Sequence, residues 1–169
     1  GSPSTVDSAI SVAASTTGFS TSPYIQYGDT SYIPYTTSTN PFTVNILAEL
    51  VDVSVVDPGG YLCSLPTEYN DELLGKVALI SRGPAGPDAC SFELKINNAE
   101  ALGAIAVVIY NYEPGVINMD AGASTLPAAF VIQSDAAVLL GLAPLTISIG
   151  PDSAVHTFVA EDPAASIGD

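Results

Sequence analysis

The sequence predicts an α/β (α+β) domain in which a mixed β-sheet is flanked by two or more short helices. Short, continuously apolar runs occur at residues 77–80, 104–110 and 126–132, and such runs are typical of strands buried on both faces. A helical pattern lies between the first two runs. With 169 residues, of which 47% are hydrophobic, the chain is long enough for one main core.

The first part of the chain predicts short strands and loops, because residues 22–46 are rich in Ser, Thr, Tyr and Pro. Residues 45–57 then alternate apolar and polar side chains, which indicates a half-buried strand. Pro58, Gly59 and Gly60 follow, and these residue types favour a turn.

The centre of the chain predicts a strand, a helix and a second strand in succession. After a strand at residues 76–82, Ser91 is placed to cap a helix over residues 91–102, and Gly103 ends it because glycine accepts left-handed backbone angles. With the strand at residues 104–110, this order predicts a right-handed crossover between two parallel strands. The apolar face of the helix is formed by residues at helical spacing: Phe92, Ile96, Ala99 and Leu102.

The last third of the chain completes the predicted core. Residues 126–132 repeat the pattern of a buried strand, Ser134 and Asp135 open a second short helix, and residues 145–149 form a closing strand. No apolar run is long enough to cross a bilayer.

The charge balance excludes two classes of partner. Eighteen acidic residues against three basic ones give a formal net charge of -15, which repels nucleic acid phosphates and anionic lipid surfaces. We therefore expect no nucleic acid and no membrane as a partner. The three cations are Lys76, Arg82 and Lys95, so every fixed positive charge lies in the central segment.

Cys63 and Cys90 either form a disulfide or remain as two buried thiols, and the interpretation that we favour is the disulfide. Two thiols and one histidine cannot by themselves supply the four ligands of a structural zinc site. A disulfide indicates an oxidising compartment. Together with the scarcity of Lys and the Ser/Thr-rich flanks, it predicts a secreted, extracellular protein.

The central segment resembles the protease-associated (PA) domain. The resemblance is carried, in order, by GKVALISRG, Cys90-Ser91-Phe92, Lys95, Asn98-Ala99, Gly103-Ala104, AVVIYN and LPAAFVI, over residues 45–150. It implies a PA-domain fold, with an open barrel, over residues 23–150. The flank at residues 1–22 looks like a segment of a subtilisin-type catalytic domain, on the pattern GSPSTVDSAISVAAST, and residues 151–169 form a C-terminal flank with a strand and a tail.

The candidate binding residues follow two predicted strands. Arg82 and Gly83 end one strand, and Asn111, Tyr112 and Glu113 end the next along the chain. Ligands of open α/β sheets bind at the carboxyl ends of strands, and in PA domains such loops are the proposed contact surface for protein or peptide partners, as the resemblance implies. Two purely structural interpretations of these residues stay open: an ion pair from Arg82 to Asp88 or Glu113, and an ordinary Pro-Gly turn after Asn111.

Other polar residues are expected to be structural or solvated. We expect His156, the one histidine, on an edge strand rather than in a catalytic site, and Lys95 on a solvated helix face or in a local ion pair. The acidic pairs Asp71-Glu72 and Glu161-Asp162 lack the spacing of a calcium loop, although a weak calcium site stays open. We expect no catalytic residue, metal or cofactor. Packing is favoured over glycan stacking for the aromatic series Tyr24, Tyr27, Tyr32, Tyr35 and Phe42.

The resemblance therefore predicts a noncatalytic PA domain of a secreted subtilisin-like serine protease. The predicted partners are a protein or peptide substrate and the parent's catalytic domain, and we expect the module to gate access to the active site. The alternatives are a PA domain of a secreted metallopeptidase or of a cargo-sorting receptor. A glycan-binding β module is a weaker alternative.

Overall fold

The computed structural model describes residues 17–83 and 85–159, with side chains described over residues 21–83 and 85–152. The chain divides into two compact units. The one described below is Pro23–Ser153, and most of the other, Gly1–Ser22 with Ala154–Asp169, lies outside the described residues. The division predicted from the sequence into two flanks and a PA domain stays a prediction.

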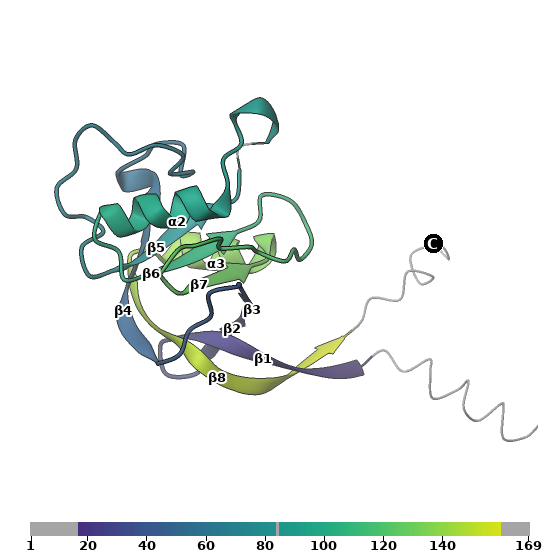
Figure 1. Cartoon of the computed structure of the whole chain (residues 1–169). Helices are drawn as coiled ribbons and strands as arrows, with labels where there is room; N and C mark the ends of the chain where they lie inside the picture. The colour runs from purple at the N-terminus through teal and green to yellow at the C-terminus, as the bar shows by residue number, and fades with distance from the viewer. Residues whose placement is uncertain (1–16, 84, 160–169) are drawn as a thin grey trace, which may run out of the picture. The chain divides into compact units, whose positions relative to one another are not determined.

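The described residues form eight strands, two α-helices and two short 3₁₀ helices (Figure 1). The helices are η1 (Val53–Val55), η2 (Gly86–Asp88), α2 (Phe92–Ala101) and α3 (Gln133–Leu142). The strands are β1 (Thr17–Tyr27), β2 (Ser31–Pro34), β3 (Thr36–Thr37), β4 (Ile46–Asp52), β5 (Val77–Ser81), β6 (Ala106–Tyr110), β7 (Ala128–Val131) and β8 (Leu145–Val159).

All eight strands belong to one mixed sheet in the order β2-β1-β8-β4-β5-β6-β7-β3. Strands β4, β5, β6 and β7 are parallel, whereas β8 pairs with β4 and β3 with β7 in antiparallel fashion. The predicted crossover with two parallel strands is therefore confirmed by the pairing of β5 with β6.

The sheet curls into a nearly closed barrel, as the resemblance implied. Strands β2 and β3 lie at opposite ends of the strand order, yet Tyr35 alone separates them in the chain. The two outer edges must therefore approach one another. Tyr35 lies at this seam: its backbone N–H donates to the carbonyl of Pro23 at 3.0 Å, and its hydroxyl donates to the carbonyl of Gly150 at 2.6 Å.

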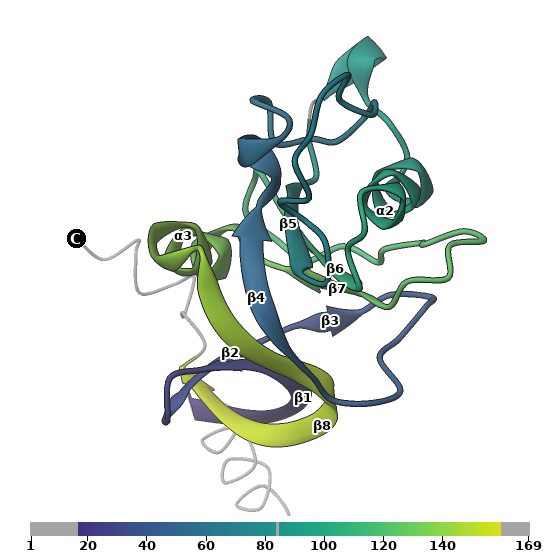
Figure 2. The ribbon, with the colours of Figure 1, turned by 90° about the vertical axis from the view of Figure 1, so that its left-hand side faces the viewer.

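Each face of the central strands is buried in a separate core. One core packs α2 against alternate residues of β5, β6 and β7, while the other fills the inside of the barrel and includes Ala136 and Leu139 of α3. Figure 2 accordingly shows α2 and α3 on opposite sides of β5. The predicted packing of Ile96, Ala99 and Leu102 on the sheet is confirmed. At about 1.5–3 kcal/mol for each large apolar side chain, these cores dominate the stability of the unit.

The predicted ends of the central helix are confirmed. The side chain of Ser91 accepts a hydrogen bond from the N–H of Leu94, so it caps α2, and Gly103 has a φ of +88° directly after the helix. Among the described residues, no helix has the length and apolarity needed to span a membrane.

The strand predicted over residues 45–57 is too long. β4 ends at Asp52, whose carboxylate accepts hydrogen bonds from both the backbone N–H and the hydroxyl of Ser54. These bonds favour the 3₁₀ turn η1 over a continued strand, because a short polar side chain can satisfy a nearby backbone donor.

Replacing Tyr35 with Phe tests the seam. We expect Tyr35→Phe to lower the free energy of unfolding by about 1–2 kcal/mol, because the buried carbonyl of Gly150 loses its donor. Tyr32→Phe is the matched control, since Tyr32 is 47% exposed, and should change stability by less than about 0.5 kcal/mol. Urea unfolding followed by circular dichroism measures both. Equal effects of the two variants would contradict this account of the seam.

Candidate partner-binding rim

Three parallel strands bring the predicted binding residues to one edge of the sheet. β5, β6 and β7 run in the same direction, so their carboxyl ends meet. Arg82 and Gly83 follow β5, residues 111–113 follow β6, and α3 begins with Gln133 after β7. We call the five predicted residues at this edge the rim: Arg82, Gly83, Asn111, Tyr112 and Glu113.

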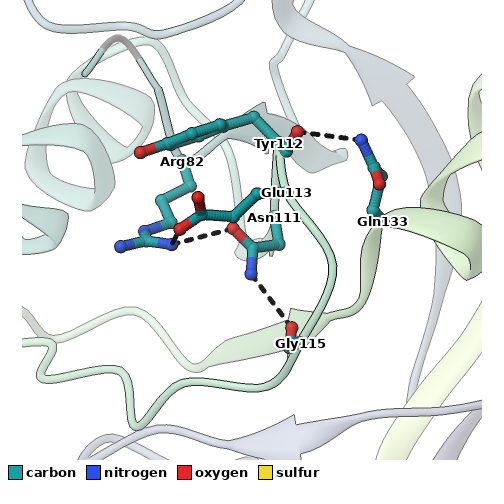
Figure 3. A network of polar contacts seen from close by, with 6 residues as sticks. All are labelled: Arg82, Asn111, Tyr112, Glu113, Gly115 and Gln133. Atoms are coloured by element: carbon teal, nitrogen blue, oxygen red, sulfur yellow. Dashed lines mark hydrogen bonds and ion pairs between the residues drawn. The ribbon is translucent and has the colours of Figure 1, made fainter.

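Arg82 contacts the three rim residues that follow β6 (Figure 3). Its Nη1 donates to Oδ1 of Asn111 at 2.9 Å and forms an ion pair with Oε1 of Glu113 at 2.8 Å. The guanidinium also lies over the ring of Tyr112, at 5.2 Å from the ring centroid. Of the two ion pairs considered for Arg82, the pair with Glu113 is the one that forms.

The turn after β6 is held by side chains on both sides. Asn111 is buried, and its Nδ2 donates to the carbonyl of Gly115 at 2.9 Å. On the other side, Nε2 of Gln133 donates to the carbonyl of Tyr112 at 2.8 Å (Figure 3). The segment is therefore more than a Pro-Gly turn, because its backbone is fixed to both Asn111 and α3.

A hollow of about 280 Å³ opens beside the rim. Arg82 and Tyr112 form one wall, and the loop that leads into α2 forms the other. Tyr112 is 40% exposed and Arg82 half-buried, so a cationic side chain and an aromatic ring are both presented to solvent at a fixed position. The remaining lining residues are Ala85, Gly86, Ala89, Cys90, Ser91 and Phe92.

The predicted disulfide between Cys63 and Cys90 is confirmed, with a Cα–Cα distance of 5.6 Å. It ties the loop after β4 to the start of α2, and Cys90 lies in the wall of the hollow. The disulfide therefore belongs to the structure that shapes this edge of the molecule.

The prediction for Lys95 is wrong. Its side chain is 0% exposed, and its Nζ donates to the carbonyl of Gly83 at 2.6 Å and to the carbonyl of Tyr61 at 2.7 Å. Burial lowers the pKa of Lys95 to about 8, and the negative charge of Asp57 opposes that shift. The acceptors are backbone carbonyls, which no side-chain pattern reveals. Helical spacing was an overlooked signal, since Lys95 lies three residues after Phe92 and four before Ala99, on the apolar face.

Gly83 lies close to the rings of two tyrosines. A Cβ atom at this position would lie 2.8 Å from Cε1 of Tyr61 and 3.5 Å from Cδ1 of Tyr112. The backbone of the rim can therefore approach the ring of Tyr61 this closely because residue 83 has no side chain, whereas the distance to Tyr112 is an ordinary van der Waals contact.

Several other predicted residues lie away from the rim. Tyr35 and Phe42 are buried in the barrel core, whereas Tyr24 and Tyr32 pack edge to face at 5.1 Å. Glu72 accepts a hydrogen bond from the N–H of Asn70. Over the described ranges, no group of three or more His, Cys, Asp and Glu residues could hold a metal ion. Glu161-Asp162 and the side chain of His156 lie outside the described residues.

The family model of the PA domain matches residues 46–139, which is more than half of the chain. The chain belongs to the PA domain family. In this PA domain, β5, Arg82-Gly83, Cys90, α2 and β6 follow one another in the order that the resemblance implied. No curated protein sequence matches the chain.

Two solved structures of aminopeptidases share the fold of this PA domain. BSAP, a zinc aminopeptidase from Bacillus subtilis, matches with a TM-score of 0.58 at 19% identity, over 90% of this chain and 37% of its own. An aminopeptidase from Aneurinibacillus sp. strain AM-1 matches with a TM-score of 0.54 at 26% identity, over 85% of this chain and 34% of its own. The PA domain chain thus spans about a third of the length of these enzymes.

A subtilisin-like protease from Pseudoalteromonas sp. AS-11 also matches, with a TM-score of 0.42 at 18% identity, over 87% of this chain and 34% of its own. That TM-score is too low to support an argument about this PA domain.

Replacing Gly83 with Ala tests the close approach at the rim. We expect Gly83→Ala to lower the free energy of unfolding by about 1–3 kcal/mol, because the new methyl group would overlap the ring of Tyr61. Gly141→Ala is the matched control: nothing lies within 4 Å of a Cβ there, and alanine favours a helix, so stability should be unchanged or up to about 1 kcal/mol higher. Thermal and urea unfolding measure both. A Gly83→Ala variant as stable as Gly141→Ala would show that the ring of Tyr61 does not exclude a side chain at residue 83.

Proposed function

We propose that this PA domain is the noncatalytic module of a larger secreted protease and that the rim is where it contacts a protein or peptide substrate. The observation that carries the proposal is the fixed presentation of Arg82 and Tyr112 beside an open hollow. Contact residues held in place before binding lose little conformational freedom on binding, which favours affinity. The similarity to about a third of two aminopeptidases supports a place within a longer protease.

The proposed contact surface combines groups suited to peptide recognition. A guanidinium can donate to carboxylates and backbone carbonyls, and an exposed tyrosine offers a rigid apolar face with a polar tip. Tyr and Arg are also the residue types most enriched among the side chains that dominate binding energy at protein interfaces. The second partner in this proposal is the catalytic domain of the parent, whose cleft the module gates.

For the parent we propose a subtilisin-type serine protease, on the pattern of residues 1–16. A secreted metallopeptidase is the second candidate, and the match to an aminopeptidase from Aneurinibacillus at 26% identity favours an aminopeptidase within that class. Two reagents applied to the whole parent protein distinguish these two candidate parents: a serine-directed fluorophosphonate, which labels a reactive serine, and a metal chelator, which inactivates a metal-dependent enzyme. Fluorophosphonate labelling supports the first parent, and chelator inactivation without labelling supports the second.

Replacing Tyr112 with Ala in the whole parent tests the rim as a contact surface. We expect Tyr112→Ala to lower kcat/KM for large protein substrates about 5–30-fold, the equivalent of 1–2 kcal/mol, and to leave cleavage of a short chromogenic peptide nearly unchanged. Tyr69→Ala is the matched control, because Tyr69 is similarly exposed, at 48% against 40%, and lies outside the rim. Equal effects on large and small substrates, or equal effects of the two variants, would contradict the proposal.

A further inference from the structure

Lys95 places a buried ammonium group directly beneath the rim. It projects from α2, and its Nζ lies 2.6 Å from the carbonyl oxygen of Gly83, 2.7 Å from that of Tyr61 and 3.7 Å from Sγ of Cys63. These acceptors come from the loop after β5 and from the loop that leads into the disulfide. One side chain thus joins two loops that are distant in sequence.

The contacts of Lys95 match the hydrogen-bonding capacity of an ammonium group. Lysine has three N–H donors, and the two carbonyl oxygens and the sulfur are three acceptors. Buried carbonyl groups need donors, and leaving one unpaired destabilises the local structure. The two carbonyl oxygens approach one nitrogen and would repel each other without it. Lys95 therefore fixes the orientation of the peptide groups at Tyr61 and Gly83.

The position of Gly83 determines the positions of its exposed neighbours. Arg82 precedes it in the chain, and the rings of Tyr61 and Tyr112 both come within 4 Å of the place where its Cβ atom would lie. The guanidinium of Arg82 in turn lies over the ring of Tyr112. A displacement of the Gly83 carbonyl would therefore be passed to both exposed groups of the rim.

We infer that Lys95 is the positioning residue of the rim, and that its ammonium group holds Arg82 and Tyr112 in the arrangement that a partner meets. The consequence for partner binding rests on the proposed function, whereas the effect on Arg82 does not. Lys95 itself is buried and touches no partner, so it acts through Gly83.

Changing the pH offers a way to remove a hydrogen bond of Lys95 without changing the sequence. Burial lowers the pKa of Lys95 to about 8, and the charged Asp57 opposes this shift. The titratable groups that face Lys95 are Asp57 and Tyr61, whose ring centroid lies 5.5 Å from Nζ, while Cys63 is bound in the disulfide. Loss of the proton above pH 8 leaves two N–H donors for three acceptors, so at least one contact is lost.

The composition of the chain permits a direct test by NMR. Arg82 is the one arginine and Lys76 and Lys95 are the two lysines, so selective ¹³C labelling gives one guanidinium signal and two lysine Cε signals. The full chain is titrated from pH 6.5 to pH 9.5. We expect the chemical shift of the Lys95 Cε to change with a midpoint at pH 8 or close to it, as its pKa of about 8 indicates. The chemical shift of the Arg82 guanidinium should change with the same midpoint, because guanidinium groups do not titrate in this pH range and the change must come from a neighbouring group.

Two variants complete the test. In Lys95→Met, the chemical shift of the Arg82 guanidinium should no longer change near pH 8. In Lys76→Met the change should remain, since Lys76 pairs with Glu49 away from the rim. An Arg82 signal that moves equally in Lys95→Met would overturn the inference, because another group would then cause it. If Lys95→Met does not fold, the wild-type chain decides: an Arg82 signal that stays constant while Lys95 titrates also overturns it.

The result of this NMR titration does not depend on the proposed function, since the chain is titrated without a partner. If Arg82 responds to Lys95 but Tyr112→Ala has no selective effect on large substrates, the positioning role stands and the proposed contact surface fails.

Discussion

The burial of the central parallel strands on both faces is the constraint on which the rest of the structure depends. β5 and β7 are buried along their whole length, and β6 along all but its last residue, between α2 on one side and the barrel interior on the other. No face of these strands remains to meet a partner. Polar and exposed groups can therefore lie only where the strands end, and because the strands are parallel, their carboxyl ends meet at one edge. The rim follows from this arrangement.

The contacts that hold the rim differ in strength. The ion pair between Arg82 and Glu113 is partly exposed and contributes about 0.2–1 kcal/mol, so it orients side chains more than it stabilises the fold. The hydrogen bond from Lys95 to the carbonyl of Gly83 is buried and the one to the carbonyl of Tyr61 is partly buried, and a hydrogen bond lost from a buried position costs more. The disulfide constrains the same region covalently. The contacts beneath the rim therefore contribute more to its stability than the ion pair at its surface.

Much of the fold could be predicted because the local signals agree with the tertiary structure. Ser91 caps α2, Gly103 ends it, and the strands on either side are parallel as their order predicted. The end of β4 at Asp52 was missed, because the hydrogen bond from Ser54 to the Asp52 carboxylate does not interrupt the alternation of apolar and polar residues from which the strand was predicted. The contacts of Lys95 and Gln133 were missed because both side chains bond to backbone carbonyls, whose positions only the folded chain defines. The five rim residues could be placed at one edge of the sheet because strand ends are visible in sequence, whereas their role in binding stays a prediction.

We propose that the chain presents the rim to a partner within a longer protease. Hydrogen–deuterium exchange of the whole parent protein, with and without a bound substrate-mimicking protein inhibitor, tests it most directly. The account predicts slower exchange of backbone amides in residues 82–86 and 111–116 when the inhibitor is bound. Slower exchange confined to the catalytic domain, with both of these segments unchanged, would contradict it.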